Sequence, residues 1–302
     1  MGRLTENARV TKVRLGTGRD GGNEYDTRAD TLAVEEPLQI RVDGTDLTTT
    51  MRTPGHDVEL AHGLLHAEGV ITSVEDVVTA RFCAGAVGPD NANTYNTLDI
   101  ALRPAPRSAV PELPELPELP GLPELPLRTL GTTTSACGVC GTTSIDDLVK
   151  EKRYTLTPEH PTAELVVSMP QRLSEGQKAF RKTGGIHAAG AFTADGRPLL
   201  VREDVGRHNA VDKVIGALLM DDRLPGDVRL RGSDPDVPAY LVVSSRASFE
   251  LVQKAVLAGF SGLIAVSAAT SLAVNTAREA GLLLTGFTRD DRFNLHSGEL
   301  AS

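Results

Sequence analysis

The chain has 302 residues, of which 40% are hydrophobic and 24% charged, so it can bury one large core or two smaller ones. Its formal net charge of −9, from 31 basic and 40 acidic residues, argues against a broad surface for nucleic acids or anionic membranes. No stretch approaches the roughly 18–20 apolar residues of a membrane span, and the N-terminus lacks the apolar segment of a signal peptide. We expect a soluble, cytoplasmic protein that binds neither nucleic acid nor membrane.

The N-terminal third shows the alternation of apolar and polar residues that predicts an antiparallel sheet. Asp43 and Gly44 form a short turn signal for a β-hairpin between the last two strands. We therefore expect a β-rich region over residues 1–110. Its strands are expected at residues 10–15, 31–34, 38–42 and 47–51.

A helix is expected to begin near Asp57 and to stop at Gly69, because apolar residues between them recur at helical spacing. His62 and His66 lie four residues apart on this helix. They could supply two imidazoles to a metal site. The more common case, which we favour, is a pair of polar residues on the exposed or half-buried face of the helix.

Residues 111–126 form an almost regular three-residue repeat of proline, glutamate and leucine. Proline at every third position blocks helix and sheet hydrogen bonds and favours polyproline II. We interpret residues 111–127 as an extended or unstructured low-complexity insert that leads into a cysteine loop at residues 128–148. Residues 149–302 form a predicted α/β domain.

The cysteine loop contains Cys137 and Cys140, flanked by glycine, serine and threonine residues. Small neighbours leave both thiols accessible, and thiol chemistry needs access as well as a lowered pKa. Cys83 follows an apolar stretch and is expected to be a buried structural residue. Three cysteines are too few for a disulfide framework, which indicates a reducing compartment.

The cysteine pair indicates either sulfur chemistry or metal binding. Structural zinc needs four Cys or His ligands at close spacing, and no second Cys-x-x-Cys or paired histidine motif follows this one. His62 and His66 could complete a site with the two cysteines, but we expect no metal. A thioredoxin-like dithiol is also disfavoured, since such motifs begin a helix directly after a buried strand.

After Asp146 the pattern changes to alternating strands and helices, which predicts a mixed or mostly parallel sheet with helices on its faces. Ligands bind in such folds where the strands end. Strands are expected at residues 191–193, 198–201, 240–243, 263–266 and 282–284, and helices at residues 169–180, 249–257 and 272–280, with a further helix that begins within residues 202–213.

Polar segments lie at three of the expected strand ends. Residues 184–187 place His187 after a glycine pair, and a core or capping histidine is the alternative. Residues 244–248 place hydroxyl groups and Arg246 where a helix start could hold an anion, and a helix cap by one of the first two serines is the alternative. Residues 286–296 carry two arginines, which suit phosphate, and two aspartates, which suit the donor edge of guanine, unless they form a solvated charge run.

Five motifs together resemble the formate dehydrogenase accessory sulfurtransferase family, the FdhD-type sulfur carriers, over most of the chain. The motifs are Cys137-Gly-Val-Cys140, Gly184-Gly-Ile-His187-Ala-Ala, Arg202-Glu-Asp-Val-Gly-Arg-His-Asn-Ala-Val-Asp-Lys213, Ser244-Ser-Arg-Ala-Ser and Gly286-Phe-Thr-Arg. The resemblance implies an α/β fold similar to that of cytidine deaminases, without deaminase activity.

The resemblance also implies a function. A member of this family takes a persulfide sulfur from a cysteine desulfurase and delivers it to the bis-molybdopterin guanine dinucleotide molybdenum cofactor, which makes formate dehydrogenase active. By position, Cys137 corresponds to the persulfide-bearing cysteine and Cys140 to its partner in relay or release. The expected cofactor contacts are Phe287, Thr288, Arg289, Asp290, Asp291 and Arg292. The expected partners are the desulfurase, formate dehydrogenase, the cofactor and a second copy of the chain in a homodimer.

Two other functions compete with sulfur transfer. A zinc-dependent deaminase needs His-x-Glu upstream of Pro-Cys-x-x-Cys. Here Ala189 stands in place of that glutamate, no proline precedes Cys137, and the order of the motifs is reversed. A chaperone that binds the cofactor without moving sulfur is the remaining alternative, and labelling of Cys137 with sulfane sulfur distinguishes it from a carrier.

Overall fold

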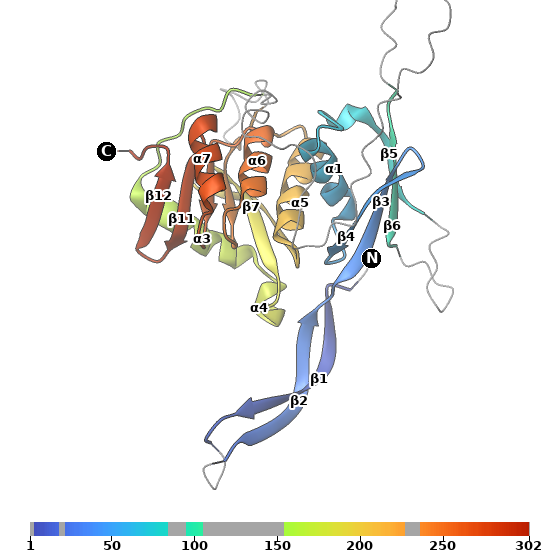
Figure 1. The fold of residues 1–302 in the computed structure, drawn as a ribbon, viewed down its shortest axis with the longest axis vertical. Coiled ribbons are helices and arrows are strands. Elements are labelled where there is room, and N and C mark those ends of the chain that lie inside the picture. The colour runs from blue at the N-terminus through green and yellow to red at the C-terminus, as the bar shows by residue number, and fades with distance from the viewer. Residues whose placement is uncertain (1–2, 18–21, 84–94, 105–153, 227–235, 302) are drawn as a thin grey trace, which may run out of the picture.

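The structure is a computed structural model that describes residues 3–17, 22–83, 95–104, 154–226 and 236–301. The predicted insert at residues 111–127 and the cysteine loop at residues 128–148 lie outside the described residues, and so do Cys137 and Cys140. Figure 1 shows the described elements as a layered α/β body with a hairpin arm that extends from it.

The arm consists of two strands, β1 (Thr5–Arg14) and β2 (Glu24–Ala33), which pair with each other in antiparallel register and form a sheet of their own. Most side chains on both faces of the arm are exposed. The expected single N-terminal sheet is therefore two sheets. The physical reason is that charged and small polar residues are spread along both strands, so neither face of the arm offers a continuous apolar surface for a core.

The second N-terminal sheet has four strands in the order β4-β3-β6-β5. Asp43 and Gly44 form the predicted hairpin turn, with φ angles of 48° and 78° that fit a type I′ turn. β3 pairs in parallel with β6, so this sheet is mixed rather than purely antiparallel. The strands are β3 (Glu36–Val42), β4 (Thr45–Arg52), β5 (Val77–Phe82) and β6 (Thr97–Leu102).

The largest sheet has six strands in the order β12-β11-β10-β9-β7-β8. β9, β10 and β11 run parallel to one another, whereas β7 runs antiparallel to β9, and β12 antiparallel to β11. The predicted mixed α/β sheet is thereby confirmed. The strands are β7 (His187–Thr193), β8 (Pro198–Asp204), β9 (Pro238–Val243), β10 (Gly262–Ala265), β11 (Leu283–Arg289) and β12 (Arg292–Ser297).

Helices cover both faces of this sheet. Leu241 and Val243 of β9 belong to a core shared with α5, α6 and α7, while Tyr240 and Val242 belong to a second core with α3. All six residues of β9 are buried, as expected for a strand covered on both faces. The helices are α3 (Ala163–Gly176), α5 (Arg207–Met220), α6 (Phe249–Ala258) and α7 (Ser271–Ala280). None of the helices in the described part of the chain has the length and apolar character that a membrane crossing requires.

Several predicted elements have different limits in the structure, among them the expected strands at residues 10–15, 31–34 and 191–193 and two elements described here. The helix expected at residues 169–180 is α3, which begins earlier because the Thr162 side chain caps it by accepting a hydrogen bond from the Leu165 amide. A short separate turn, α4 (Phe180–Thr183), follows it. The strand expected at residues 282–284 is β11, which continues to Arg289 because Thr285 and Thr288 are fully buried there, with their hydroxyl oxygens 2.9 Å apart.

A close helix contact joins the four-stranded sheet to the six-stranded one. α1 (Asp57–Ala67) packs against α5. A methyl group on Gly63 would lie 1.9 Å from the Asp212 carbonyl oxygen, and one on Gly216 would lie 1.8 Å from the Glu59 carbonyl oxygen. Only glycine leaves room for these backbones, so the two residues set the distance between the helices.

His62 and His66 do not lie on an exposed or half-buried face, because the packing of α1 buries both of them. The Nδ1 atom of His62 lies 2.8 Å from the Val58 carbonyl oxygen, one turn earlier. Burial lowers the pKa of His62 despite this hydrogen bond. His62 is therefore a neutral core residue at ordinary pH.

The segment from Arg202 to Lys213 holds the two sheets together through buried polar contacts. The Lys213 ammonium lies 2.6 Å from the Asp204 carboxylate and donates a hydrogen bond to the Thr53 carbonyl oxygen at 2.9 Å. The Asn209 amide donates to the carbonyl oxygen of Met51 at 2.8 Å. Thr53 and Met51 belong to the N-terminal region, so this motif has a structural role that the sequence pattern alone did not predict.

A second ionic contact in the same interface joins Arg202 of β8 to Glu59 of α1, with Nη2 and Oε1 2.9 Å apart. Burial raises the pKa of Glu59, but hydrogen bonds and positive charge from His56 and Arg202 outweigh it and lower the pKa from 4.5 to about 2. The ionised carboxylate is therefore more stable in the folded chain than in the unfolded one.

We expect the Arg202–Glu59 pair to make the free energy of unfolding depend on pH in the acidic range. Because the folded pKa is lower, the stabilisation is fully present above pH 4.5 and is lost as the pH falls toward 2. The shift corresponds to at most about 3 kcal/mol. Urea unfolding of Glu59→Gln and wild type should differ most at neutral pH and converge in acid, whereas the exposed control Glu175→Gln should follow the wild type. An equal difference at pH 7 and pH 3 would contradict this assignment.

Candidate functional site

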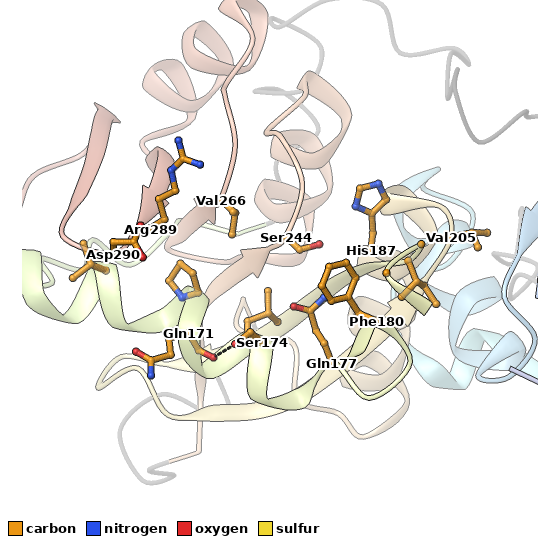
Figure 2. Close-up of a pocket in the computed structure, with 16 residues that line it drawn as sticks. Gln171, Ser174, Gln177, Phe180, His187, Val205, Ser244, Val266, Arg289 and Asp290 are labelled. Atoms are coloured by element: carbon orange, nitrogen blue, oxygen red, sulfur yellow. Dashed lines mark hydrogen bonds between the residues drawn. The ribbon is translucent and has the colours of Figure 1, made fainter. Parts of the chain in front are cut away.

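A cavity of about 710 Å³ opens at one end of the six-stranded sheet, where β9, β10 and β11 finish. Its size lies within the range typical of small-molecule sites. Figure 2 shows Arg289 and Asp290 at one side of the cavity, His187 and Phe180 at the other, and Ser244 with Val266 between them. Its lining residues are Val167, Pro170, Gln171, Leu173, Ser174, Gln177, Phe180, Gly184, Gly185, Ile186, His187, Val205, Ser244, Val266, Arg289 and Asp290.

The strand order explains why these residues meet. β9, β10 and β11 are parallel, so Ser244, Val266 and Arg289 all lie at the carboxyl ends of their strands. β7 runs in the opposite direction, which brings its first residue, His187, to the same edge. The structure thus gathers at one cavity the three polar segments that the sequence placed at strand ends.

The opposite wall comes from α3 and the turn that follows it. Gln171, Ser174 and Gln177 face the cavity, and the Ser174 hydroxyl donates a hydrogen bond to the Gln171 carbonyl oxygen at 2.7 Å (Figure 2). Gly184 ends α4 with a φ of 67°, a left-handed conformation that directs the chain into β7. The residues of this wall were not predicted, although polar residues at every third position beside an apolar helix face were a usable signal.

His187 is half-buried at the cavity wall. Burial lowers its pKa, and the charges of Arg207 and His208 lower it further. Both of these residues lie in the first turn of α5, which also begins at this edge. A neutral imidazole results, which can donate or accept a hydrogen bond, so His187 is a polar wall residue rather than a core or capping histidine.

Ser244 does not cap a helix. Its hydroxyl accepts a hydrogen bond from the Ala188 amide at 2.9 Å, which ties the end of β9 to the start of β7. The N-cap of α6 is Ser248, so the alternative of a cap by Ser244 or Ser245 is wrong. Arg246 is exposed and is not among the residues that line this cavity.

The expected cofactor segment is the tip of a β-hairpin rather than a loop after the last strand. Arg289 and Arg292 pair across a two-residue turn formed by Asp290 and Asp291. The loop prediction failed because the strand continues through polar residues that carry no apolar signal. Thr288 points into the core, Phe287 is 41% exposed, and only Arg289 and Asp290 of the six expected contacts line the cavity.

Cys83 directly follows β5 and is half-buried rather than buried. Its amide donates a hydrogen bond to the Thr97 carbonyl oxygen at 2.9 Å, so its backbone extends the β5–β6 pairing. Beyond this backbone contact, the structural role expected for Cys83 stays a prediction.

Among the described residues no three His, Cys, Asp or Glu side chains gather as a metal site would require, but the cysteine pair lies outside them. Absence of zinc therefore stays a prediction. Metal analysis of the full-length protein should give well under one zinc per chain, because two thiols alone do not close a tetrahedral site. Stoichiometric zinc that disappears in Cys137→Ser would contradict it.

Comparison with known proteins now identifies the family. The model of the FdhD/NarQ family matches residues 33–301. The chain belongs to the FdhD/NarQ family. Among relatives that match it, the sulfur carrier protein FdhD of Corynebacterium efficiens is 54% identical over 99% of this chain and 100% of its own length. The protein of the same name from Streptomyces avermitilis is 44% identical over 99% of this chain and 96% of its own.

A solved structure confirms the fold of this FdhD/NarQ member. It is the crystal structure of a putative formate dehydrogenase accessory protein from Desulfotalea psychrophila, with a TM-score of 0.64 and 18% identity. The match covers 98% of this chain and 97% of that one. The resemblance drawn from five sequence motifs is therefore confirmed as family membership.

Proposed function

We propose that this protein is a sulfur carrier that accepts a persulfide sulfur on Cys137 from a cysteine desulfurase and transfers it to the bis-molybdopterin guanine dinucleotide molybdenum cofactor. Such a transfer activates formate dehydrogenase, the protein that we expect to receive the product. The family and its relatives named as sulfur carriers support the sulfur chemistry. The structural observation that carries the proposal is the cavity lined by Arg289 and Asp290 at one side and by His187 at the other. We also expect a homodimer in the cytoplasm.

The atoms and electrons of the proposed sulfur transfer balance with the desulfurase persulfide, the two cysteines and one external thiol reductant. The Cys137 thiolate attacks the outer sulfur of the desulfurase persulfide, whose S–S bond breaks and releases the desulfurase thiolate. The Cys140 thiolate then attacks the inner sulfur of the Cys137 persulfide and releases hydrosulfide to the molybdenum centre. Two electrons pass from the cysteine pair to the transferred sulfur, and a thiol reductant must reduce the resulting disulfide before the next cycle.

The cavity suits the nucleotide end of this substrate. The Arg289 guanidinium can bind a phosphate through two parallel hydrogen bonds, and the Asp290 carboxylate can accept from the amino and imino groups of guanine. His187, neutral because of its lowered pKa, adds a polar group without a competing charge. Adenine lacks the donor pair that Asp290 would recognise, so the cavity is expected to prefer guanine nucleotides.

Labelled sulfur tests the carrier function directly. The full-length protein should acquire one sulfur atom after incubation with a desulfurase and sulfur-labelled cysteine, and a reductant should remove it because a persulfide exchanges like a disulfide. Transfer of the label to the molybdenum cofactor would complete the test. A protein that binds the cofactor and never acquires the label would be a chaperone instead.

Calorimetry with guanosine and adenosine diphosphates tests the cavity. Guanosine diphosphate should bind more tightly, and Arg289→Ala should weaken it by about 1.5–3 kcal/mol, the range for a hydrogen bond to a charged group. Arg292→Ala is the matched control, since Arg292 lies across the same turn without lining the cavity. Equal affinities for the two nucleotides, or no effect of Arg289→Ala, would place the nucleotide elsewhere.

A further inference from the structure

A second cavity of about 730 Å³ lies on the other side of α4. It is formed by the start of the hairpin arm, the turn before α1, the end of α3 and the end of β8. Ile186 lines both cavities. Gln177 and Phe180 line the first cavity, whereas Gly176, Lys178, Ala179 and Lys182 line the second. The α4 segment is therefore a thin wall between two neighbouring cavities.

The second cavity is strongly basic although the chain carries a net charge of −9. The charged residues that line it include five cations and one carboxylate, together with the imidazole of His56. They are Arg3, Lys178, Lys182, Arg202, Lys213 and Glu203. Such a concentration of positive charge in a hollow attracts anions more strongly than scattered surface charges do.

Some of these charges already have partners. Arg202 pairs with Glu59, and Lys213 pairs with Asp204. The Glu203 carboxylate accepts hydrogen bonds from the Ala179 and Phe180 amides, each at 2.8 Å, which fixes the wall between the cavities.

Three cations remain for a ligand. Arg3, Lys178 and Lys182 are exposed at the cavity and make no ion pair with any carboxylate in the described part of the chain. A ligand with a single carboxylate would leave most of this positive charge unbalanced. A pyrophosphate group carries several negative charges on a compact set of acceptor oxygens. Lysine and arginine are the side chains that bind such groups.

We propose that this second cavity binds the pyrophosphate group of a phosphorylated small molecule. The inference rests on the proposed function, because the dinucleotide substrate has two arms, each with a pyrophosphate, and the adjoining cavity takes one of them. A separate nucleotide diphosphate offers the same chemistry. The charge pattern assigns the pyrophosphate, and competition between ligands identifies its source.

Calorimetry with inorganic pyrophosphate tests the site on the full-length chain. The double variant Lys178→Ala/Lys182→Ala should bind pyrophosphate on the order of tenfold more weakly than wild type, since each lost ammonium removes a charge-assisted contact. Lys12→Ala, an exposed lysine on the hairpin arm, is the control and should match the wild type. Thermal unfolding of each variant checks that the fold is retained.

Arg289→Ala separates this proposal from the proposed function. Pyrophosphate binding that depends on Lys178 and Lys182 but not on Arg289 supports the second site. It does so even if Arg289→Ala leaves the affinity for guanosine diphosphate unchanged, a result that would contradict only the proposed nucleotide cavity. If the wild type binds two guanosine diphosphates and the double variant one, displacement of both by a single molecule of the dinucleotide cofactor would identify its second arm as the source. A second nucleotide that the cofactor does not displace would identify a separate molecule. Equal pyrophosphate affinity in wild type and double variant, or no binding to the wild type, would overturn the proposal.

Discussion

Replacement of Cys137 by alanine is expected to abolish both the acquisition of persulfide sulfur and the activation of formate dehydrogenase. The reason is chemical: the persulfide forms on a thiolate, and the proposed pathway assigns that thiolate to Cys137. Intact-mass measurement after incubation with a desulfurase should show the added sulfur in wild type and none in the variant. Activity of co-expressed formate dehydrogenase should fall to background.

Two further cysteine variants sharpen this result. Cys140→Ala should still acquire sulfur but should release it poorly, because Cys140 supplies the attacking thiolate and the electrons for release. Cys83→Ala is the matched control and should keep both activities, since we assign Cys83 a structural role. A Cys137→Ala protein that still acquired sulfur and still activated the enzyme would refute the assignment.

Replacement of Gly216 by alanine should be the most damaging substitution in the body of the protein. The added methyl would lie 1.8 Å from the Glu59 carbonyl oxygen, and a backbone atom in a packed helix cannot move aside as a flexible side chain can. Alanine favours a helix by about 1 kcal/mol relative to glycine, but overpacking typically costs about 1–3 kcal/mol, and a clash with backbone belongs at or above the upper end. Chemical denaturation should show a net loss of roughly 2 kcal/mol or more.

Gly22→Ala provides the matched control for the same added methyl group, because in the described part of the chain no atom beyond its neighbours lies within 4 Å of the position it would occupy. Its unfolding transition should coincide with that of the wild type. Gly63→Ala should resemble Gly216→Ala, since its methyl would meet the Asp212 carbonyl oxygen at 1.9 Å. Stability of Gly216→Ala equal to that of the control would mean that α1 and α5 do not pack as closely as the structure has them.

The fold was predictable where burial leaves a periodic apolar pattern. The strands through Tyr240 and Leu263 and the helix that begins at Asp57 carry such patterns, and the structure has all three. The end of β11 was not predictable in this way, because Thr285 and Thr288 are buried while satisfying each other's hydroxyl groups. The hairpin arm was misplaced because alternation of residues indicates a strand but does not show which other strands it pairs with.

The part of the candidate site formed by strand ends was predictable from the sequence, but the wall formed by α3 was not. A strand end is a local feature, so Ser244 and Arg289 could be placed at the same edge from sequence order alone. The contribution of α3 depends on which helix face turns toward the cavity, a property of tertiary packing. The buried contacts of Asp204 and Lys213 were beyond reach for the same reason, since their partner Thr53 is remote in sequence.

At the hairpin tip, residues 289–292, the side chains proposed to contact the ligand differ from those that stabilise the fold. Its strands are anchored by the buried Thr285–Thr288 pair, while Arg289, Asp290 and Asp291 are exposed. Exchange of exposed side chains on a turn usually changes the free energy of unfolding by no more than about 0.5 kcal/mol. On the proposed function, ligand preference can therefore evolve at this hairpin tip at little cost in stability, whereas the glycine contact between α1 and α5 leaves little room for change.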